Sequence, residues 1–318
     1  MIDANKSDGS MPKPEIEVSL PRYEDPRQFD AKAPCYWYHS MQFPDGERVR
    51  GSWTIESFHN YIGGFDLEGK AVLDVGTASG YLAFHAEKAG ALVTALDAAS
   101  TREFRHVPFA ESLSYQNIKQ YQELWESQNL VPIKNSWWYA RHKFGSAARC
   151  VYAPMAELYE WPEQMFDVVM AGAIVEHLSD PVFAIGAWAR LAKDAVLIPF
   201  TDVLPVADLM MRPITPLDDS RINYVWWHLS RGLYDKIFGN LGFDVHYTLA
   251  HAEHHDDARG STVAARPSII ALRRGSAATR NFDTSALNDP VRPVPSPAAV
   301  PASPHTRHQR FLSRLWRR

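Results

Sequence analysis

A short apolar segment followed by a glycine loop constrains the fold of this chain more than any other feature. Residues 71–75 are mostly apolar, and Gly76 and Gly80 come directly before the helix-forming segment 81–89. Glycine lets a chain turn tightly and leaves room for a ligand against the backbone. The first turn of the helix then offers free N–H groups to a polar ligand. The pattern predicts a strand, a ligand-binding turn and a helix within an α/β fold.

Strand-like and helix-like segments alternate along residues 70–273. The strand-like segments are 71–75, 91–96, 149–152, 166–171, 195–200, 243–249 and 268–273, and the helix-like segments are 81–89, 182–192 and 234–241. Nearly continuous apolar strands separated by helices are typical of a parallel sheet that is covered on both faces. A chain of 318 residues has room for about two domains or for one enlarged domain.

Changes in composition divide the chain into three regions. Residues 1–34 are rich in proline and predict an extended arm. Residues 35–274 carry the alternating pattern and form the expected domain, with an insertion at about 98–148 that is too long for an ordinary connection. Residues 275–318 predict a disordered tail, because six prolines fall between positions 290 and 304.

The tail ends in a basic, amphipathic tip. Its last twelve residues contain five arginines and no acid, and Phe311, Leu312, Leu315 and Trp316 would share one helical face. Such a tip predicts weak contact with a membrane surface or a partner, or serves only as a solubilising tail.

Composition and charge exclude several classes of protein. Hydrophobic residues make up 46% and charged residues 22% of the chain, as in soluble globular proteins. No apolar run approaches the roughly 20 residues that a membrane-spanning helix needs, and the acidic first thirty residues do not resemble a signal peptide. The two cysteines, Cys35 and Cys150, fit a reducing cytoplasm. A net charge of -4 does not favour a nucleic-acid partner.

A second acidic residue indicates which ligand the glycine loop accepts. Asp97 ends the next strand, 21 residues after Gly76, where a carboxylate can accept both hydroxyls of a ribose. A nicotinamide site would need a second glycine at the position of Ala78. Asp74 would repel a pyrophosphate, whereas it suits a cationic amino acid. These residues favour S-adenosylmethionine over a dinucleotide.

The whole arrangement resembles the class I S-adenosylmethionine-dependent methyltransferases. The likeness rests on the pattern D-x-G-x-x-x-G at residues 74–80 and on residues 166–172, followed by the E-H-L-x-D-P pattern at 176–181. It implies a Rossmann-like, seven-stranded sandwich whose sheet is mostly parallel with an antiparallel last strand. An aromatic N-terminal cap and a helical insertion would cover the cofactor. The cofactor-binding residues would be Asp74, Gly76, Thr77, Gly80, Asp97, Met155 and Gly172.

Within this class, several aromatic segments are similar to the tRNA wobble-uridine 5-oxyacetic-acid methyltransferase branch. They are residues 37–39, 136–142 and 226–228. That branch places a tyrosine where this chain has Val175, so ordinary S-adenosylmethionine is expected here. Pro154 stands where many relatives bind adenine with an aspartate, so we expect Met155 to pack on the adenine ring. Glu157 is an alternative acceptor for the adenine amino group.

Methyl transfer to oxygen or nitrogen needs a positioned acceptor and a group that accepts a proton. His177 is the first candidate base and His39 the second. Each has a plainer explanation, since His177 could order its loop and His39 could simply be a packed core histidine. Glu176 either binds a polar ligand or is a solvated acid. Residues 251–257 lie between the last two strand-like segments and are expected in a loop. Their histidines match no standard zinc spacing, so no metal site is predicted.

Aromatic residues are numerous enough to line an acceptor pocket, although they could equally form a small core under a lid. The candidates are Trp37, Tyr38, Trp138, Trp226 and Trp227. The sequence therefore predicts methyl transfer from S-adenosylmethionine to an oxygen or nitrogen of a small-molecule or glycolipid-like acceptor. The alternatives are a tRNA-modifying methyltransferase and a non-catalytic binding protein. The oligomeric state and the identity of the acceptor stay open.

Overall fold

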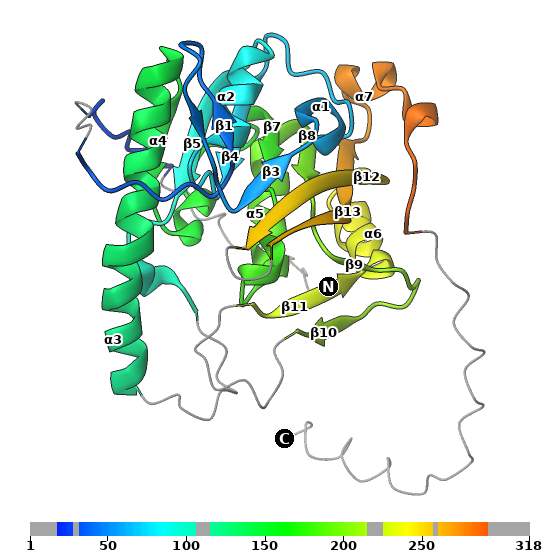
Figure 1. Ribbon diagram of the computed structural model, residues 1–318. Helices are drawn as coiled ribbons and strands as arrows, with labels where there is room; N and C mark the ends of the chain where they lie inside the picture. Colours follow the sequence, from blue (N-terminus) through cyan, green and yellow to red (C-terminus); the bar gives the residue numbers. More distant parts are fainter. Residues whose placement is uncertain (1–17, 28–31, 106–114, 215–224, 257–259, 292–318) are drawn as a thin grey trace, which may run out of the picture.

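The computed structural model describes residues 18–27, 32–105, 115–214, 225–256 and 260–291 (Figure 1). In these residues an eight-stranded sheet forms the centre of the fold. Its strands run in the order β3 (Trp53–Ile55), β12 (Phe243–Asp256), β13 (Gly260–Arg273), β8 (Ala192–Ile198), β7 (Phe166–Met170), β4 (Ala71–Val75), β5 (Leu92–Asp97) and β6 (Arg149–Tyr152).

The sheet confirms the predicted α/β fold. Strands β8, β7, β4, β5 and β6 pair in parallel, and the last strand, β13, is antiparallel to both β8 and β12. The short strand β3 extends the expected seven strands to eight by pairing with β12. This strand comes from the aromatic N-terminal part of the domain, so Trp53 lies in the edge strand of the sheet.

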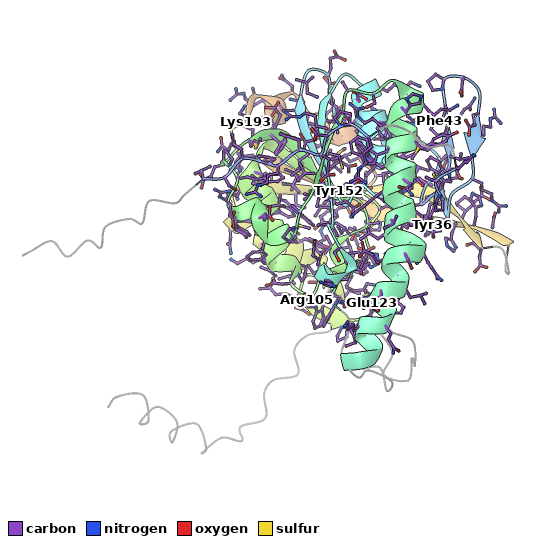
Figure 2. The ribbon with its side chains drawn as sticks, turned by 90° about the vertical axis from the view of Figure 1, so that its left-hand side faces the viewer. Tyr36, Phe43, Arg105, Glu123, Tyr152 and Lys193 are labelled. Carbon is purple, nitrogen blue, oxygen red and sulfur yellow. The ribbon has the colours of Figure 1, made fainter. Side chains whose placement is uncertain are left out.

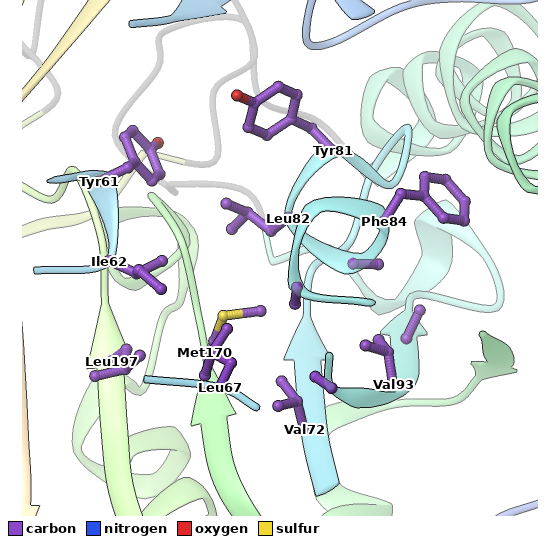
Figure 3. Packing of buried hydrophobic residues seen from close by; sticks show 14 of the residues in the cluster. Tyr61, Ile62, Leu67, Val72, Tyr81, Leu82, Phe84, Val93, Met170 and Leu197 are labelled. Carbon is purple, nitrogen blue, oxygen red and sulfur yellow. The ribbon is translucent and has the colours of Figure 1, made fainter. Parts of the chain in front are cut away.

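Apolar residues alternate between the two faces of the central strands, as a sheet buried on both faces requires. Val72, Met170 and Leu197 point to the face covered by helices α1 (Phe58–Tyr61), α2 (Tyr81–Lys88) and α4 (Val131–Phe144), and Figure 3 shows this packing. Their neighbours Leu73 and Val169 point to the face covered by α5 (Pro181–Leu191) and α6 (Arg231–Asn240).

The predicted insertion forms a long helical run beside the sheet. Helix α3 (Tyr115–Trp125) continues through a π-helical turn, η2 (Glu126–Leu130), into α4. Figure 2 shows this run with Glu123 towards one end and Phe43 beside the other. Trp137 of α4 packs against Phe84 of α2, with ring centroids 5.4 Å apart, so the insertion is anchored on the helix that follows the glycine loop.

Smaller elements complete the described part of the chain. Strands β1 (Met41–Gln42) and β2 (Arg48–Val49) form a hairpin, and β10 (Met211–Pro213), β11 (Trp227–Ser230) and β9 (Val203–Leu204) form a second, three-stranded sheet that the sequence did not predict. Short 3-10 turns are η1 (Thr101–Glu103), η3 (Met155–Tyr159), η4 (Val175–His177) and η5 (Thr284–Ala286).

The prediction of a disordered tail from residue 275 is wrong for its first part. Helix α7 (Ala277–Asn281) follows β13, and the Phe282 ring packs on Phe65 at 5.6 Å. Further along, Val291 is 3% exposed, and Arg231 pairs with Asp289 at 2.6 Å. The proline-rich composition did not indicate these contacts, because each of them depends on a single residue within the segment. The remaining tail and the basic tip lie outside the described residues.

Residues 18–27 of the predicted arm run along the edge of the sheet. The backbone N–H of Glu24 donates to the carbonyl of Cys150 at 2.8 Å, and the Arg149 guanidinium lies 3.1 Å from the ring centroid of Tyr23. Residues 1–17 and 28–31 of the arm lie outside the described residues. Among the described helices, none has the length and apolar character needed to cross a membrane.

Candidate functional site

Two neighbouring cavities lie at the carboxyl ends of the parallel strands. The loop cavity, of about 270 Å³, is lined by Gly76, Ala78 and Asp97 on one side and by Gly172 and His177 on another. The side cavity, of about 310 Å³, is bounded by residues from β3, β13 and the loops after β7 and β8. A larger cavity of about 620 Å³ lies elsewhere, near Lys70 at the amino end of β4, and shares none of the predicted site residues.

The glycine loop adopts the tight turn that its sequence predicts. Gly76 and Gly80 have φ values of +72° and +89°, a region in which side chains are disfavoured. A Cβ atom on Gly80 would come within 2.3 Å of the Phe84 ring, and one on Gly76 within 2.5 Å of Ile174. Two backbone N–H groups, those of Gly76 and Thr77, donate to the Leu96 carbonyl at 2.8 and 3.1 Å. The loop is therefore held against the end of β5.

Asp97 lies where the loop and β5 meet. One carboxylate oxygen accepts the N–H of Ala78 and the other accepts the N–H of Ala98, both at 2.8 Å. Burial raises the pKa of Asp97, and its backbone hydrogen bonds oppose that shift. Each carboxylate oxygen can accept more than one hydrogen bond, so this side chain keeps capacity for hydroxyl groups of a ligand in the loop cavity.

Asp74 lies beneath the loop rather than in the cavity wall. It is completely buried, and no hydrogen bond of good geometry reaches either carboxylate oxygen from the described residues, although Thr77 and the backbone of Ala83 lie close enough to favour its charged form. Desolvation raises the pKa of Asp74 to about 7. A buried carboxylate with no cation beside it favours a nearby positive charge, and this property fits the sulfonium and ammonium charges of S-adenosylmethionine.

Of the remaining predicted cofactor residues, some line the loop cavity and others lie outside it. Gly172 lines the loop cavity, whereas Thr77 is buried and Gly80 is the N-cap of helix α2. Met155 packs into the core on the face of α5 and does not line either cavity in the described part of the chain. Its predicted contact with adenine stays a prediction.

Three residues, Tyr38, Ala173 and His177, line both cavities. His177 ends the turn η4, whose position after β7 places it at the carboxyl edge of the sheet. Tyr38 enters from the N-terminal aromatic segment, and its burial raises its pKa to about 12, so its phenol is neutral. The border between the cavities therefore carries one imidazole and one hydroxyl group.

The second candidate base, His39, lies outside both cavities. Its ring is 4.9 Å from that of Tyr38 and 5.3 Å from that of Tyr81, and the residue is 8% exposed. Desolvation, together with the nearby His85, lowers the pKa of His39 to about 3. An imidazole with such a pKa is a weak base, and its packing is that of a core histidine.

Most of the predicted acceptor-binding aromatics pack against other residues and do not line a described cavity. Trp37 packs on Phe43 and Tyr139, and Trp138 packs on Trp137. Of the five candidates, Tyr38 alone lines a described cavity.

Trp226 and Trp227 are stacked at 6.1 Å, and their indole N–H groups donate to the carbonyls of Arg105 and Ser179. They hold the loops around the site together.

Other aromatic residues form the wall of the side cavity. Trp53, Tyr61 and Phe200 line it, and the Phe200 ring lies 5.4 Å from Trp53 and 5.5 Å from Tyr61. The abundance of aromatics signalled such a wall, but its members come from β3, α1 and the end of β8. No single stretch of sequence indicated that they meet.

Charged residues occupy the remaining wall of the side cavity. Glu176 is 6% exposed, accepts the Thr201 hydroxyl at 3.2 Å, and has its pKa raised by burial. Arg266 of β13 approaches Glu176 at 3.8 Å and Asp202 at 3.5 Å, and His228 lies 3.4 Å from Asp202. The sequence singled out Glu176, but gave no signal for Asp202 or Arg266.

The expectation of a loop over the histidine-rich segment 251–257 is wrong for residues 251–256, and residue 257 lies outside the described residues. Strand β12 continues through Asp256, and its backbone pairs with that of β13 along this segment. His255 contacts the hydroxyls of Thr54 and Ser261 at 2.7 and 2.8 Å, and His254 packs on Trp53. In the residues that the structure describes, no group of three or more His, Cys, Asp or Glu side chains is placed to hold a metal ion.

Comparison with known proteins places several methyltransferases among similar structures. Magnesium protoporphyrin IX methyltransferase from Synechocystis PCC 6803, with bound SAH, is 17% identical over 65% of this chain and 76% of its own, with a TM-score of 0.39. The N-terminal domain of EvdMO1, in the presence of SAH and D-fucose, is 14% identical over 75% and 91%, with a TM-score of 0.45. The 1,6-didemethyltoxoflavin-N1-methyltransferase of Burkholderia thailandensis is 15% identical over 68% and 74%, with a TM-score of 0.40. No family model and no curated protein matches the sequence.

Proposed function

We propose that this chain transfers a methyl group from S-adenosylmethionine to an oxygen or nitrogen atom of a small molecule. The observation that carries the proposal is the shared border of the two cavities. The glycine loop and Asp97 line one cavity, an aromatic and charged wall lines the other, and His177 belongs to both. A cofactor in the loop cavity and an acceptor in the side cavity would meet at this border.

The residues of the loop cavity suit S-adenosylmethionine. Asp97 would accept the ribose hydroxyls, and Gly76 and Gly172 would let the cofactor lie close to the backbone. The buried carboxylate of Asp74 would favour the cationic amino-acid part through the loop. When bound, this cofactor supplies an electrophilic methyl group on a sulfonium sulfur.

His177 and Tyr38 would act on the acceptor. In this proposal His177 accepts the proton that leaves an acceptor hydroxyl or amine, and the neutral Tyr38 hydroxyl orients the acceptor. The aromatic wall excludes water from the acceptor and holds it by apolar contact. Holding the acceptor in line with the methyl group is the larger contribution of the protein.

A methyl-transfer assay tests the proposal. The full chain in excess over methyl-labelled S-adenosylmethionine is mixed with a panel of amine and hydroxyl acceptors, and label transfer is followed in a single turnover. The proposal predicts transfer to at least one acceptor and its loss in His177→Asn. Tight cofactor binding without any transfer would instead support the non-catalytic binding protein.

A tRNA-modifying activity is the remaining alternative, which the sequence resemblance to the wobble-uridine branch raises. RNA binding depends on neutralised phosphates, and the net charge of -4 supports a small-molecule acceptor instead. Filter binding of tRNA at several salt concentrations separates the two. Salt-sensitive binding of tRNA in the micromolar range or tighter would contradict the small-molecule proposal.

A further inference from the structure

The charges of the side cavity do not balance. Among its described lining residues, Glu176 and Asp202 carry negative charges and Arg266 carries the single positive charge, while His177 and His228 are the remaining ionisable groups besides two tyrosines. With both histidines neutral, the formal sum is therefore one negative charge. Glu176 is the more deeply buried of the two carboxylates, and a buried charge that is only partly compensated is costly, so the cavity favours a cationic occupant.

Arg266 does not satisfy either carboxylate fully. Its guanidinium lies 3.8 Å from Glu176 and 3.5 Å from Asp202, beyond the range of about 2.7–3.2 Å for a good N–H to oxygen hydrogen bond. The Glu176 side chain is 8% exposed and that of Asp202 is 39% exposed, while Arg266 is 31% exposed. The more deeply buried carboxylate, Glu176, is therefore also the one farther from the arginine. An N–H donor in the cavity would reach Glu176 without displacing an existing close ion pair.

The aromatic wall of the same cavity also suits a cation. The guanidinium of Arg266 lies 5.2 Å from the ring centroid of Phe200 and 5.8 Å from that of Trp53. Aromatic faces attract cations within about 6 Å of the ring centroid, and the attraction increases when water is excluded. The rings of Phe200 and Trp53 thus already lie within reach of one cation, and the Tyr61 ring lies beside Phe200 in the same wall.

We propose that the methyl acceptor carries a protonated amine, which binds in the side cavity against Glu176 and Asp202 with its apolar body along Trp53, Tyr61 and Phe200. This inference rests on the proposed function, because it takes the side cavity as the acceptor site. The ammonium group donates hydrogen bonds to the two carboxylates and compensates their excess charge. An acceptor that is an anion would be repelled by Glu176, because Arg266 is already shared between two carboxylates.

The test uses three probes that differ in one terminal group. Tyramine, tyrosol and 4-hydroxyphenylacetate share the same hydroxylated ring and end in an ammonium, a hydroxyl and a carboxylate group. Each is titrated by calorimetry into the full chain saturated with S-adenosylhomocysteine. The inference predicts that tyramine binds at least ~10-fold more tightly than tyrosol, and that 4-hydroxyphenylacetate binds most weakly.

Substitutions then identify the recognising groups. Glu176→Gln keeps the shape of the side chain and should abolish the preference for tyramine over tyrosol. Asp202→Asn, at a more exposed position, should reduce it and serves if the buried substitution prevents folding. Glu163→Gln is the matched control, because Glu163 is 71% exposed and does not line this cavity.

Each outcome bears on one proposal. If S-adenosylhomocysteine does not bind, the proposed function fails before the amine is tested. If it binds but tyramine shows no advantage over tyrosol, or if none of the probes binds, the inferred amine is wrong while the cofactor assignment stands. Tightest binding of 4-hydroxyphenylacetate would show that Arg266 determines the substrate charge, which would also overturn the inference.

Discussion

The carboxylate of Asp97, at the end of β5, accepts the backbone N–H of Ala78 at 2.8 Å and thereby joins two neighbouring strand ends through the glycine loop. Ala78 has a φ of +49°, so a residue other than glycine is held in the left-handed region at this point. The same carboxylate lines the loop cavity. Asp97 therefore shapes the loop and faces the space that the loop encloses.

Replacing Gly80 by alanine should lower the free energy of unfolding by about 1–3 kcal/mol or more. The left-handed backbone alone costs an L-residue roughly 1–2 kcal/mol, and the added Cβ would also collide with Phe84 and Trp137. Gly46→Ala is the control, because Gly46 has nearly the same φ, +90°, with no atom within 4 Å of the added Cβ. Urea denaturation of both variants separates backbone strain from collision. Equal losses would show that the space around Gly80 does not matter.

The pH dependence of stability should reveal Asp74. Its pKa is raised to about 7 in the folded chain from an ordinary value of 3.8, so the folded state binds more protons than the unfolded state between these pH values. The contribution of Asp74 to stability therefore decreases as the pH rises from about 4 to about 7 and is constant above that. Asp74→Asn cannot ionise and should lack this decrease.

Urea midpoints of the native chain and of Asp74→Asn, measured from pH 4 to pH 8, check this expectation. The variant should gain stability relative to the native chain as the pH rises through this window. Asp244→Asn, on an exposed side chain, is the control. A constant difference between Asp74→Asn and the native chain would show that Asp74 is ionised throughout.

The sequence predicts the residues of the loop cavity better than those of the side cavity. The reason is that the residues of the side cavity lie far apart in the sequence. Gly76, Gly80 and Asp97 belong to one strand–helix–strand unit, so their local pattern was enough to place them together. The side cavity instead joins β3 to β13 through Trp53 and Arg266, which are 213 residues apart in the sequence. The contact between such distant residues depends on the order of the strands in the sheet, and hydrophobic periodicity does not reveal that order.

Truncation should show that the packed part of the chain reaches Val291. Ending the chain at Gly275 removes the buried Val291 and the ion pair of Asp289 with Arg231. Burial of one valine contributes roughly 1.5–3 kcal/mol, which corresponds to a decrease of the melting temperature by roughly 3–12 °C at about 2–4 °C per kcal/mol in a domain of this size. Ending the chain after Val291 is the control and should leave the melting temperature unchanged. Equal melting temperatures for both truncations would contradict the packing of residues 276–291.

This segment also shows a limit of composition as a guide. The prolines that predicted disorder begin at position 290, yet the contacts of Phe282 and Val291 come from single apolar residues in a polar stretch. An average over the tail conceals them. The histidines of β12 are similar, because alternation along a strand that is partly exposed looks like a polar loop.

Catalysis by His177 predicts a large effect on rate and a small one on cofactor affinity. General base catalysis contributes roughly 10²–10⁴-fold, so His177→Asn should slow the single-turnover methyl transfer by about that factor. His39→Asn is the control, because His39 is buried outside both cavities and should affect stability more than rate. If His177→Asn kept a near-native rate, the histidine would position the loop and the transfer would rest on proximity.

Titration calorimetry with S-adenosylhomocysteine tests the central claim most directly. The account predicts that the native chain binds this ligand and does not bind NAD. It also predicts that Asp97→Ala weakens the affinity by ~10-fold or more, because a hydrogen bond to a charged group contributes roughly 1.5–3 kcal/mol. Asp244→Ala, at an exposed carboxylate, should bind as the native chain does. Unchanged affinity in a folded Asp97→Ala variant, or tight binding of NAD by the native chain, would contradict the claim.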